Sequence, residues 1–166
     1  MLRSFDGHKP TIAESAYVDE TAVIIGNVVL DSESSIWPGA VLRGDHGQII
    51  VREGANIQDN ATVHESVEIG SYATVGHNAI VHNATIGRKS VVGMGAVVLD
   101  NSKIGEGSIV AANSVVTENN HVPEGVLVAG SPAKVIKNID SGYWQNAGKR
   151  YVERAKRYKE CSEIIE

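Results

Sequence analysis

Hydrophobic residues along this chain follow a six-residue period. Aliphatic side chains occupy every sixth position in three runs, offset first by three extra residues and then by one residue fewer. The runs are Ile12, Val18, Ile24, Leu30, Ile36 and Leu42; Val51, Ile57, Val63, Ile69, Val75 and Val81; and Ile86, Val92, Val98, Ile104, Val110 and Val116. A small residue follows many of these positions by four, as at Ala22, Ala40 and Ser108. This period fits neither an amphipathic helix nor an alternating strand, and it is typical of a parallel β-helix with the aliphatic and small residues inside.

The repeat divides the chain into four expected segments. Residues 12–121 form the β-helix, with about six coils in the marked series, and residues 1–11 lead into it. Residues 122–140 contain several Pro and Gly residues and are expected to form a loop that closes the β-helix. Residues 141–166 are expected to form an α-helix. The predicted fold class is therefore mostly β.

The C-terminal segment changes to helical spacing. Its apolar residues recur at intervals of three and four, with charged residues between them. The positions are Trp144, Ala147, Tyr151, Val152, Ala155 and Tyr158. This pattern predicts an amphipathic helix that packs along the β-helix wall. Its basic residues are interspersed with Glu153 and Glu160, which favours a solvated outer face over a site for an anionic partner.

Composition and charge narrow the possible roles. The net charge of −5 disfavours general binding to nucleic acid. The single cysteine, Cys161, excludes an internal disulfide framework. No run of 18 apolar residues is present, and the N-terminus lacks the apolar core of a secretion signal. We therefore expect a cytoplasmic protein without a membrane span.

Histidines align when the chain is wound at about eighteen residues per coil. His64 and His82 are eighteen residues apart at the same phase of the repeat, so they should stack on neighbouring coils. Arg43 belongs to the same column one coil earlier, once the three extra residues are allowed for. Asp59 and His77 are also eighteen apart, but they form a second column on the preceding face.

The two columns suggest a metal ion shared between subunits. Tetrahedral zinc needs donor nitrogens roughly 3.3 Å apart, a spacing that two stacked histidines can reach. His77 lies on another face of the same prism, so we expect it to reach the ion of a neighbouring subunit. Three-fold symmetry would close this contact into a ring. The plain alternative is that these histidines are unrelated solvated side chains.

Several segments resemble the gamma-class carbonic anhydrases, a family within the hexapeptide-repeat (isoleucine-patch) superfamily. The matching segments are VLRGDHGQIIV, NIQDNATVHE, VGHNAIVHNATIG and AGSPAKVI, with Tyr151-Val152 in the terminal helix. The resemblance implies a left-handed triangular β-helix and a homotrimer. It implies metal binding by His64 and His82 of one subunit and His77 of the next.

The resemblance also assigns the surrounding residues and an activity. It places Arg43, Asp45 and Asp59 at the subunit interface, around the metal ligands, and Gln58 near the metal-bound solvent. The implied reaction is the reversible hydration of CO2 to bicarbonate, with Zn²⁺ as the cofactor and Fe²⁺ or Co²⁺ as alternatives, since imidazole suits all three. His64, His77 and His82 would leave a coordination position open, as catalytic zinc sites do.

Two departures from the family bear on proton transfer. The founding members have an acidic loop after the first metal histidine, whereas His64 is followed here by a short Glu-Ser-Val segment. The same members have Glu where this chain has His46. His46, expected in the inserted loop, is a candidate proton shuttle because its ordinary pKa is near 6.5. Tyr151 is a second candidate site residue, with a role in helix packing as the alternative.

Two other functions stay open at the level of sequence. One is an acyl-CoA transferase or thioesterase on the same β-helix, since GSPAKVI is also common in hexapeptide acyltransferases. The other is a metal-binding homologue without catalytic activity, because the ligands can persist after proton transfer is lost.

Overall fold

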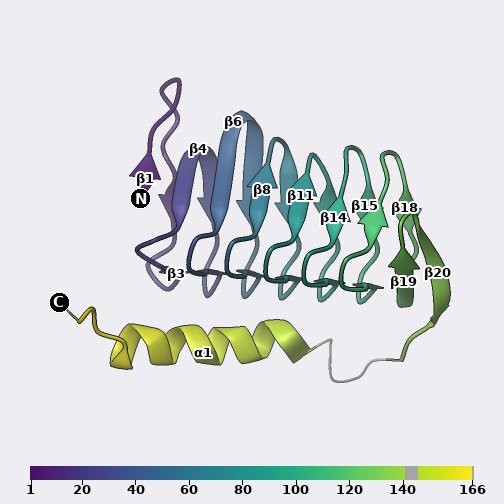
Figure 1. Cartoon of the computed structure of the whole chain (residues 1–166). Helices are drawn as coiled ribbons and strands as arrows, with labels where there is room; N and C mark the ends of the chain where they lie inside the picture. Colours follow the sequence, from purple (N-terminus) through teal and green to yellow (C-terminus); the bar gives the residue numbers. More distant parts are fainter. Residues whose placement is uncertain (141–145, 166) are drawn as a thin grey trace.

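The computed structural model describes residues 1–140 and 146–165. These residues form a parallel β-helix of about seven turns and one α-helix that lies along it (Figure 1). The mostly β fold class predicted from the six-residue period is confirmed. No helix in this part of the chain is long and apolar enough to cross a membrane.

Short parallel strands build the three faces of the β-helix. The first face contains β8 (Thr62–His64), β11 (Ile80–His82), β14 (Val97–Val98) and β17 (Val115–Val116). The second contains β9 (Val67–Ile69), β12 (Thr85–Ile86), β15 (Lys103–Ile104) and β18 (His121–Val122). The third contains β3 (Tyr17–Val18), β5 (Ser35–Ile36), β7 (Asn56–Ile57), β10 (Thr74–Val75), β13 (Val91–Val92), β16 (Ile109–Val110), β19 (Val126–Gly130) and β20 (Ala133–Asn138).

Two long strands join the first two faces in the early coils. They are β4 (Val23–Leu30) and β6 (Val41–Val51), and β6 pairs with both β8 and β9. The expected lead-in also joins this sheet, because β1 (Leu2–Arg3) and β2 (Thr11–Ile12) both pair with β4. The three extra residues after Leu42 thus extend a strand, whereas a loop was expected there.

The aliphatic repeat forms the core. Sixteen of the eighteen marked aliphatic residues are buried, and only Ile12 and Val18 in the first coil are partly buried. Alanine and serine occupy the small positions because the interior has no room for longer side chains. Ser34 and Ser90 are fully buried and donate their hydroxyl hydrogens to backbone carbonyls of Asp31 and Gly87. The predicted inward pattern is therefore confirmed.

The repeat continues beyond the point where the sequence suggested a loop. Val122 and Val128 are buried at the next two six-residue positions, so residues 122–140 add a further coil instead of a loop. Gly125, with φ 62°, sits at a turn between strands and does not end the repeat. Strands β19 and β20 then pair antiparallel and cover the end of the core.

Helix α1 (Ala147–Cys161) runs back along the third face (Figure 1). Its buried residues are Ala147, Gly148, Val152 and Ala155. An aromatic cluster joins it to the β-helix: the Trp37 ring lies 5.3 Å from Tyr151, 5.0 Å from Tyr158 and 5.1 Å from Tyr17. The predicted helical residue Trp144 falls outside the described residues.

Candidate metal site

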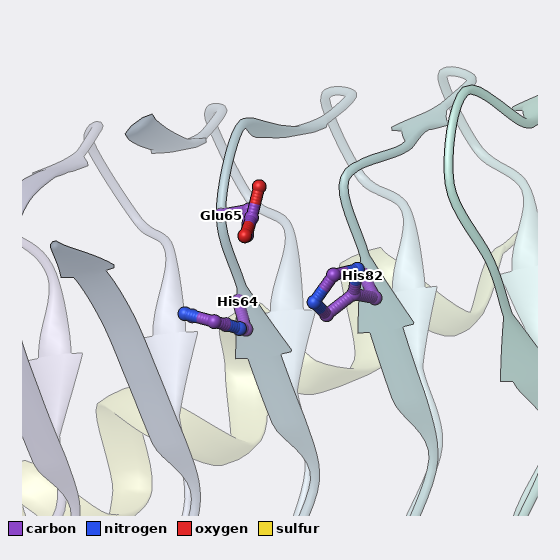
Figure 2. A group of neighbouring side chains, drawn as sticks. All are labelled: His64, Glu65 and His82. Atoms are coloured by element: carbon purple, nitrogen blue, oxygen red, sulfur yellow. The ribbon is translucent and has the colours of Figure 1, made fainter. Parts of the chain in front are cut away.

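The expected histidine column is present on the first face. Strands β6, β8 and β11 are adjacent and parallel, with Arg43 opposite His64 and His64 opposite His82. The two imidazole rings have their centroids 5.0 Å apart. Figure 2 shows both rings on the same side of β8 and β11. The structure therefore brings together the pair that the eighteen-residue spacing predicted.

Arg43 and Asp45 both contact the His64 ring. Nε2 of His64 lies 3.0 Å from Oδ1 of Asp45, and Nδ1 lies 3.3 Å from the Arg43 guanidinium. Because a guanidinium only donates hydrogen bonds, Nδ1 is the acceptor and the Nε2–H group donates to Asp45. A metal ion at His64 must therefore displace one of these two partners.

The Asp45 carboxylate is stabilised in its charged form. Arg43 donates to its Oδ2 over 2.5 Å. Desolvation acts to raise the pKa of Asp45, but the hydrogen bonds from Arg43 and His64 outweigh it and hold the pKa at about 2. Asp45 is therefore an anion at neutral pH.

His82 is oriented by a carboxylate that the sequence interpretation missed. Its Nδ1 lies 3.0 Å from Oδ2 of Asp100, which leaves Nε2 free to bind a metal ion. Asn83 donates to the other oxygen of Asp100 over 3.3 Å. Desolvation acts to raise the pKa of Asp100, but the bonds from Asn83 and His82 lower it overall. Such a carboxylate–histidine pair is common around metal ligands.

His77 and Asp59 form the separate column that the sequence predicted. Nδ1 of His77 lies 2.7 Å from Oδ2 of Asp59, at the turn between β10 and β11. Within the described residues, the group of possible ligand atoms that lie within 4.8 Å of one another contains His64, Glu65 and His82, and it excludes His77 of the same chain. Glu65 was not among the predicted site residues, although it follows Val63 by two residues, just as His77 follows Val75.

Gln58 is nearly buried and fixed by its neighbours. Its Nε2 donates to Oδ1 of Asn56 over 3.1 Å, and Asn56 in turn donates to the Thr74 hydroxyl over 2.9 Å. The Gln58 amide is therefore held with its nitrogen toward Asn56, which leaves the oxygen available as an acceptor. Asn56 was also missed, although a buried asparagine two residues before Gln58 lies on the same face.

A cavity adjoins this network between the third face and the start of α1. Its volume is about 580 Å³, and its lining includes Gln58, His77, Met94 and Tyr151. Tyr151 is half-buried; burial raises the pKa of its hydroxyl, and Asp59 adds to this effect. The Arg154 guanidinium lies 5.0 Å from the centre of the Tyr151 ring. Tyr151 thus packs α1 against the β-helix and also faces the cavity.

His46 lies apart from the stacked histidines. It is in the middle of β6, its side chain is 75% exposed, and its Nδ1 is 3.9 Å from Oδ1 of Asp45. The expected inserted loop is part of β6, where the register with β4 shifts by three residues between Gly44 and Ile49. His46 contacts Asp45, which in turn contacts His64, and its proton-shuttle role stays a prediction.

The residues present fit a divalent metal ion. Two imidazoles stack in register, and a hydrogen-bonded carboxylate lies on one nitrogen of each ring. Nitrogen donors with outer carboxylate partners are the usual environment of zinc and related ions.

Comparison with known proteins identifies relatives of this chain. The family described as the GMPPB C-terminal domain matches residues 45–148. The chain is 40% identical over 166 residues to the carbonic anhydrase of Geobacillus kaustophilus, covering 96% of this chain and 91% of that protein. It is 39% identical over 148 residues to the carnitine operon protein CaiE of Escherichia coli K12, covering 86% of this chain and 76% of that protein.

The fold has a close match among solved structures. A hexapeptide transferase family protein of Anaplasma phagocytophilum superposes with a TM-score of 0.92 and is 39% identical, covering 95% of this chain and 98% of that chain. The relatives thus differ in described activity while sharing one architecture. The chain belongs to the hexapeptide-repeat β-helix family that contains this carbonic anhydrase and CaiE.

Proposed function

We propose that this protein catalyses the reversible hydration of CO2 to bicarbonate at a divalent metal ion. The ion is bound by His64 and His82 of one subunit and by His77 of the next, within a homotrimer. The observation that carries this proposal is that His82 lies opposite His64 in the strand register, with Asp100 in contact with Nδ1 of His82. The 40% identity to a carbonic anhydrase supports the choice of reaction.

Zn²⁺ is the proposed ion, with Fe²⁺ or Co²⁺ as alternatives. A metal held by three imidazoles supplies bound water whose pKa falls to about 7. Asp100 fixes the ring and tautomer of His82 so that Nε2 points outwards. Asp59 can do the same for His77 through its 2.7 Å contact with Nδ1.

Gln58 is the proposed residue for orienting solvent or CO2. Its Nε2 donates one hydrogen bond to Asn56, and its oxygen can accept a hydrogen bond from a solvent molecule. A fixed acceptor favours one orientation of that molecule, which lowers the entropy lost in reaching the transition state. Arg43 and Asp45 hold His64 in place and, with Asp59, lie at the proposed subunit interface.

Proton transfer completes the proposed cycle. His46 is exposed to solvent and lies 3.9 Å from Asp45, so it can pass a proton between the site edge and bulk water. Tyr151 lines the cavity next to Gln58 and His77, where its hydroxyl can form a hydrogen bond with a bound molecule. We also propose that the protein is cytoplasmic and that its ligands are CO2 and bicarbonate. It is proposed to have no nucleic-acid or membrane partner.

Stopped-flow CO2 hydration tests this proposal. The zinc-loaded protein and the iron-loaded protein, prepared anaerobically, are compared with His82→Ala and with His121→Ala, an exposed histidine on the second face. We expect hydration by at least one loaded form, its loss in His82→Ala and its retention in His121→Ala. Stoichiometric metal without hydration in either loaded form would refute the hydratase activity and leave the metal site.

A second candidate function is acyl-CoA transfer or thioester hydrolysis. The observation that favours it is the cavity of about 580 Å³ beside Gln58 and His77, which has room for an acyl group. The 39% identical structure named as a hexapeptide transferase adds support. Release of free thiol from acyl-CoA, with no hydration of CO2, would select this function. Metal binding with neither activity would indicate a non-catalytic homologue.

A further inference from the structure

Glu65 places a carboxylate beside the two stacked histidines of its own chain. A carboxylate oxygen of Glu65 and ring nitrogens of His64 and His82 all lie within 4.8 Å of one another. Figure 2 shows the three side chains together at the ends of β8 and β11. All three are partly buried. This group is complete within one subunit.

The backbone explains why Glu65 joins the histidines. Side chains alternate along a strand, so the residue after the outward His64 would normally point into the core. Glu65 instead has φ 66°, in the left-handed region, which turns the chain at the end of β8. The corresponding turns of the next two coils hold Asn83 and Asn101, with φ 46° and 57°.

Several residues of this fold adopt left-handed angles, including Glu33, Tyr72 and Lys89, and Glu65 differs from them in lying beside two histidines. Asparagine adopts left-handed backbone angles several times more readily than most residues, whereas glutamate gains nothing from them. A residue held in such a conformation at a site is a reason to look for a function. Here the conformation keeps a carboxylate next to two imidazoles.

The three groups form a known kind of donor set. Two histidines and one glutamate hold catalytic zinc in several hydrolases, with metal–donor distances of about 2.0–2.2 Å. Tetrahedral geometry brings such donors to roughly 3.3 Å from one another. The donor atoms lie within 4.8 Å of one another here, so binding an ion requires them to move closer together.

We propose that His64, Glu65 and His82 of a single chain bind one zinc-like divalent ion without help from a neighbouring subunit. The inference rests on the metal site of the proposed function and adds a donor to it. On assembly, His77 of the neighbouring subunit takes the place of Glu65, which leaves a position for solvent. The ion can then load before the trimer forms.

Metal titration of variants tests this inference. The probes are Zn²⁺ in a competition titration and Co²⁺ followed by visible absorption. We expect His77→Ala to bind one ion per chain, and His77→Ala with Glu65→Asn to bind at least about 100-fold more weakly, beyond the loss typical of an outer-shell change. Glu65→Asn alone should keep its ion through His77. Asparagine suits this test because Asn83 already adopts the same turn.

The matched control is Glu33→Asn in the His77→Ala background. Glu33 also has a left-handed backbone, with φ 56°, but lies at another turn and pairs with Lys156. Its replacement should leave metal affinity unchanged, and thermal unfolding confirms that each variant folds. Glu65→Gln gives a second way to remove the carboxylate charge.

The outcomes separate this inference from the proposed function. Loss of the ion in His77→Ala alone, or equal affinity with and without Glu65, would overturn the role of Glu65 and leave the three-histidine site. Wild-type affinity in both His64→Ala and His82→Ala would overturn the two proposals together.

Discussion

Single residues around the stacked histidines decide which ring nitrogen can bind a metal ion. His82 has Asp100 on Nδ1, and His64 has Asp45 on Nε2. The two rings therefore differ in which nitrogen contacts a carboxylate, although they occupy the same phase of the repeat. His82 is ready to bind through Nε2, whereas His64 must first leave one partner.

Replacing Asp100 with asparagine should weaken metal binding about 10–100-fold, because an outer carboxylate fixes the orientation and basicity of its histidine. Glu106→Gln is the control, since Glu106 forms an exposed pair with Arg88 away from the histidines. Competition titration with Zn²⁺ measures both variants. Equal affinity in Asp100→Asn and wild type would show that His82 needs no such orientation.

The sequence predicted the histidine columns but not all of their partners. His64 and His82 could be paired because both follow a buried aliphatic residue at one phase of the repeat. Asp100 lies eighteen residues after His82, but the coil between them is one residue shorter, so counting by the phase of the repeat selects Leu99 and passes over Asp100. Glu65 was missed because its position depends on a backbone angle that the period does not encode.

Strand β6 carries Arg43 and Asp45 on the same side of the sheet as His64. Gly44 lies between them and packs closely on the preceding coil: a Cβ atom there would lie 2.5 Å from the backbone oxygen of Asn27. Just after this contact the pairing of β6 with β4 shifts, from Gly26 opposite Gly44 to Val28 opposite Ile49, so the three extra residues of β6 form a bulge. Only the glycine itself indicates this close approach in the sequence.

Gly44→Ala should therefore destabilise the protein. Relieving the contact requires β4 and β6 to separate, at a typical overpacking cost of about 1–3 kcal/mol. Urea unfolding followed by circular dichroism measures this cost as a lower midpoint. An unchanged midpoint would mean that the backbone at Asn27 moves freely.

Helix α1 is attached through aromatic rings, and Tyr17 lies within this contact. Burial raises the pKa of the Tyr17 hydroxyl, and its hydrogen bond to Asp19 adds to the effect. Because the folded-state pKa is the higher one, the stabilisation is complete below about pH 10 and is lost as the pH rises above it.

Tyr17→Phe should reduce the loss of stability above about pH 10, since phenylalanine keeps the ring without the ionisable hydroxyl. Thermal unfolding of both proteins between neutral and alkaline pH measures this difference. Parallel pH dependence of the two proteins would show that Tyr17 does not titrate with unfolding.

The whole molecule presents His77 and the histidine pair on different parts of one β-helix. A head-to-tail contact repeated three times would join each pair to a His77 and close into a ring. The end of the β-helix was placed too early in the sequence, because Pro123 and Gly125 also suit a turn between coils. The trimer stays a prediction, drawn from the family resemblance and from the separate positions of the histidines.

Light scattering should therefore give a mass three times the 17.7 kDa of one chain. His77→Ala should keep this mass if other contacts hold the trimer. A monomer at micromolar concentration would remove the basis for a site shared between subunits.

The most direct test is a crystal structure of the metal-loaded protein, with anomalous diffraction measured at the zinc and iron edges. The account predicts one anomalous peak per subunit, about 2.0–2.1 Å from nitrogen atoms of His64 and His82 of one subunit and His77 of the next. Peaks elsewhere, or none after loading, would contradict it.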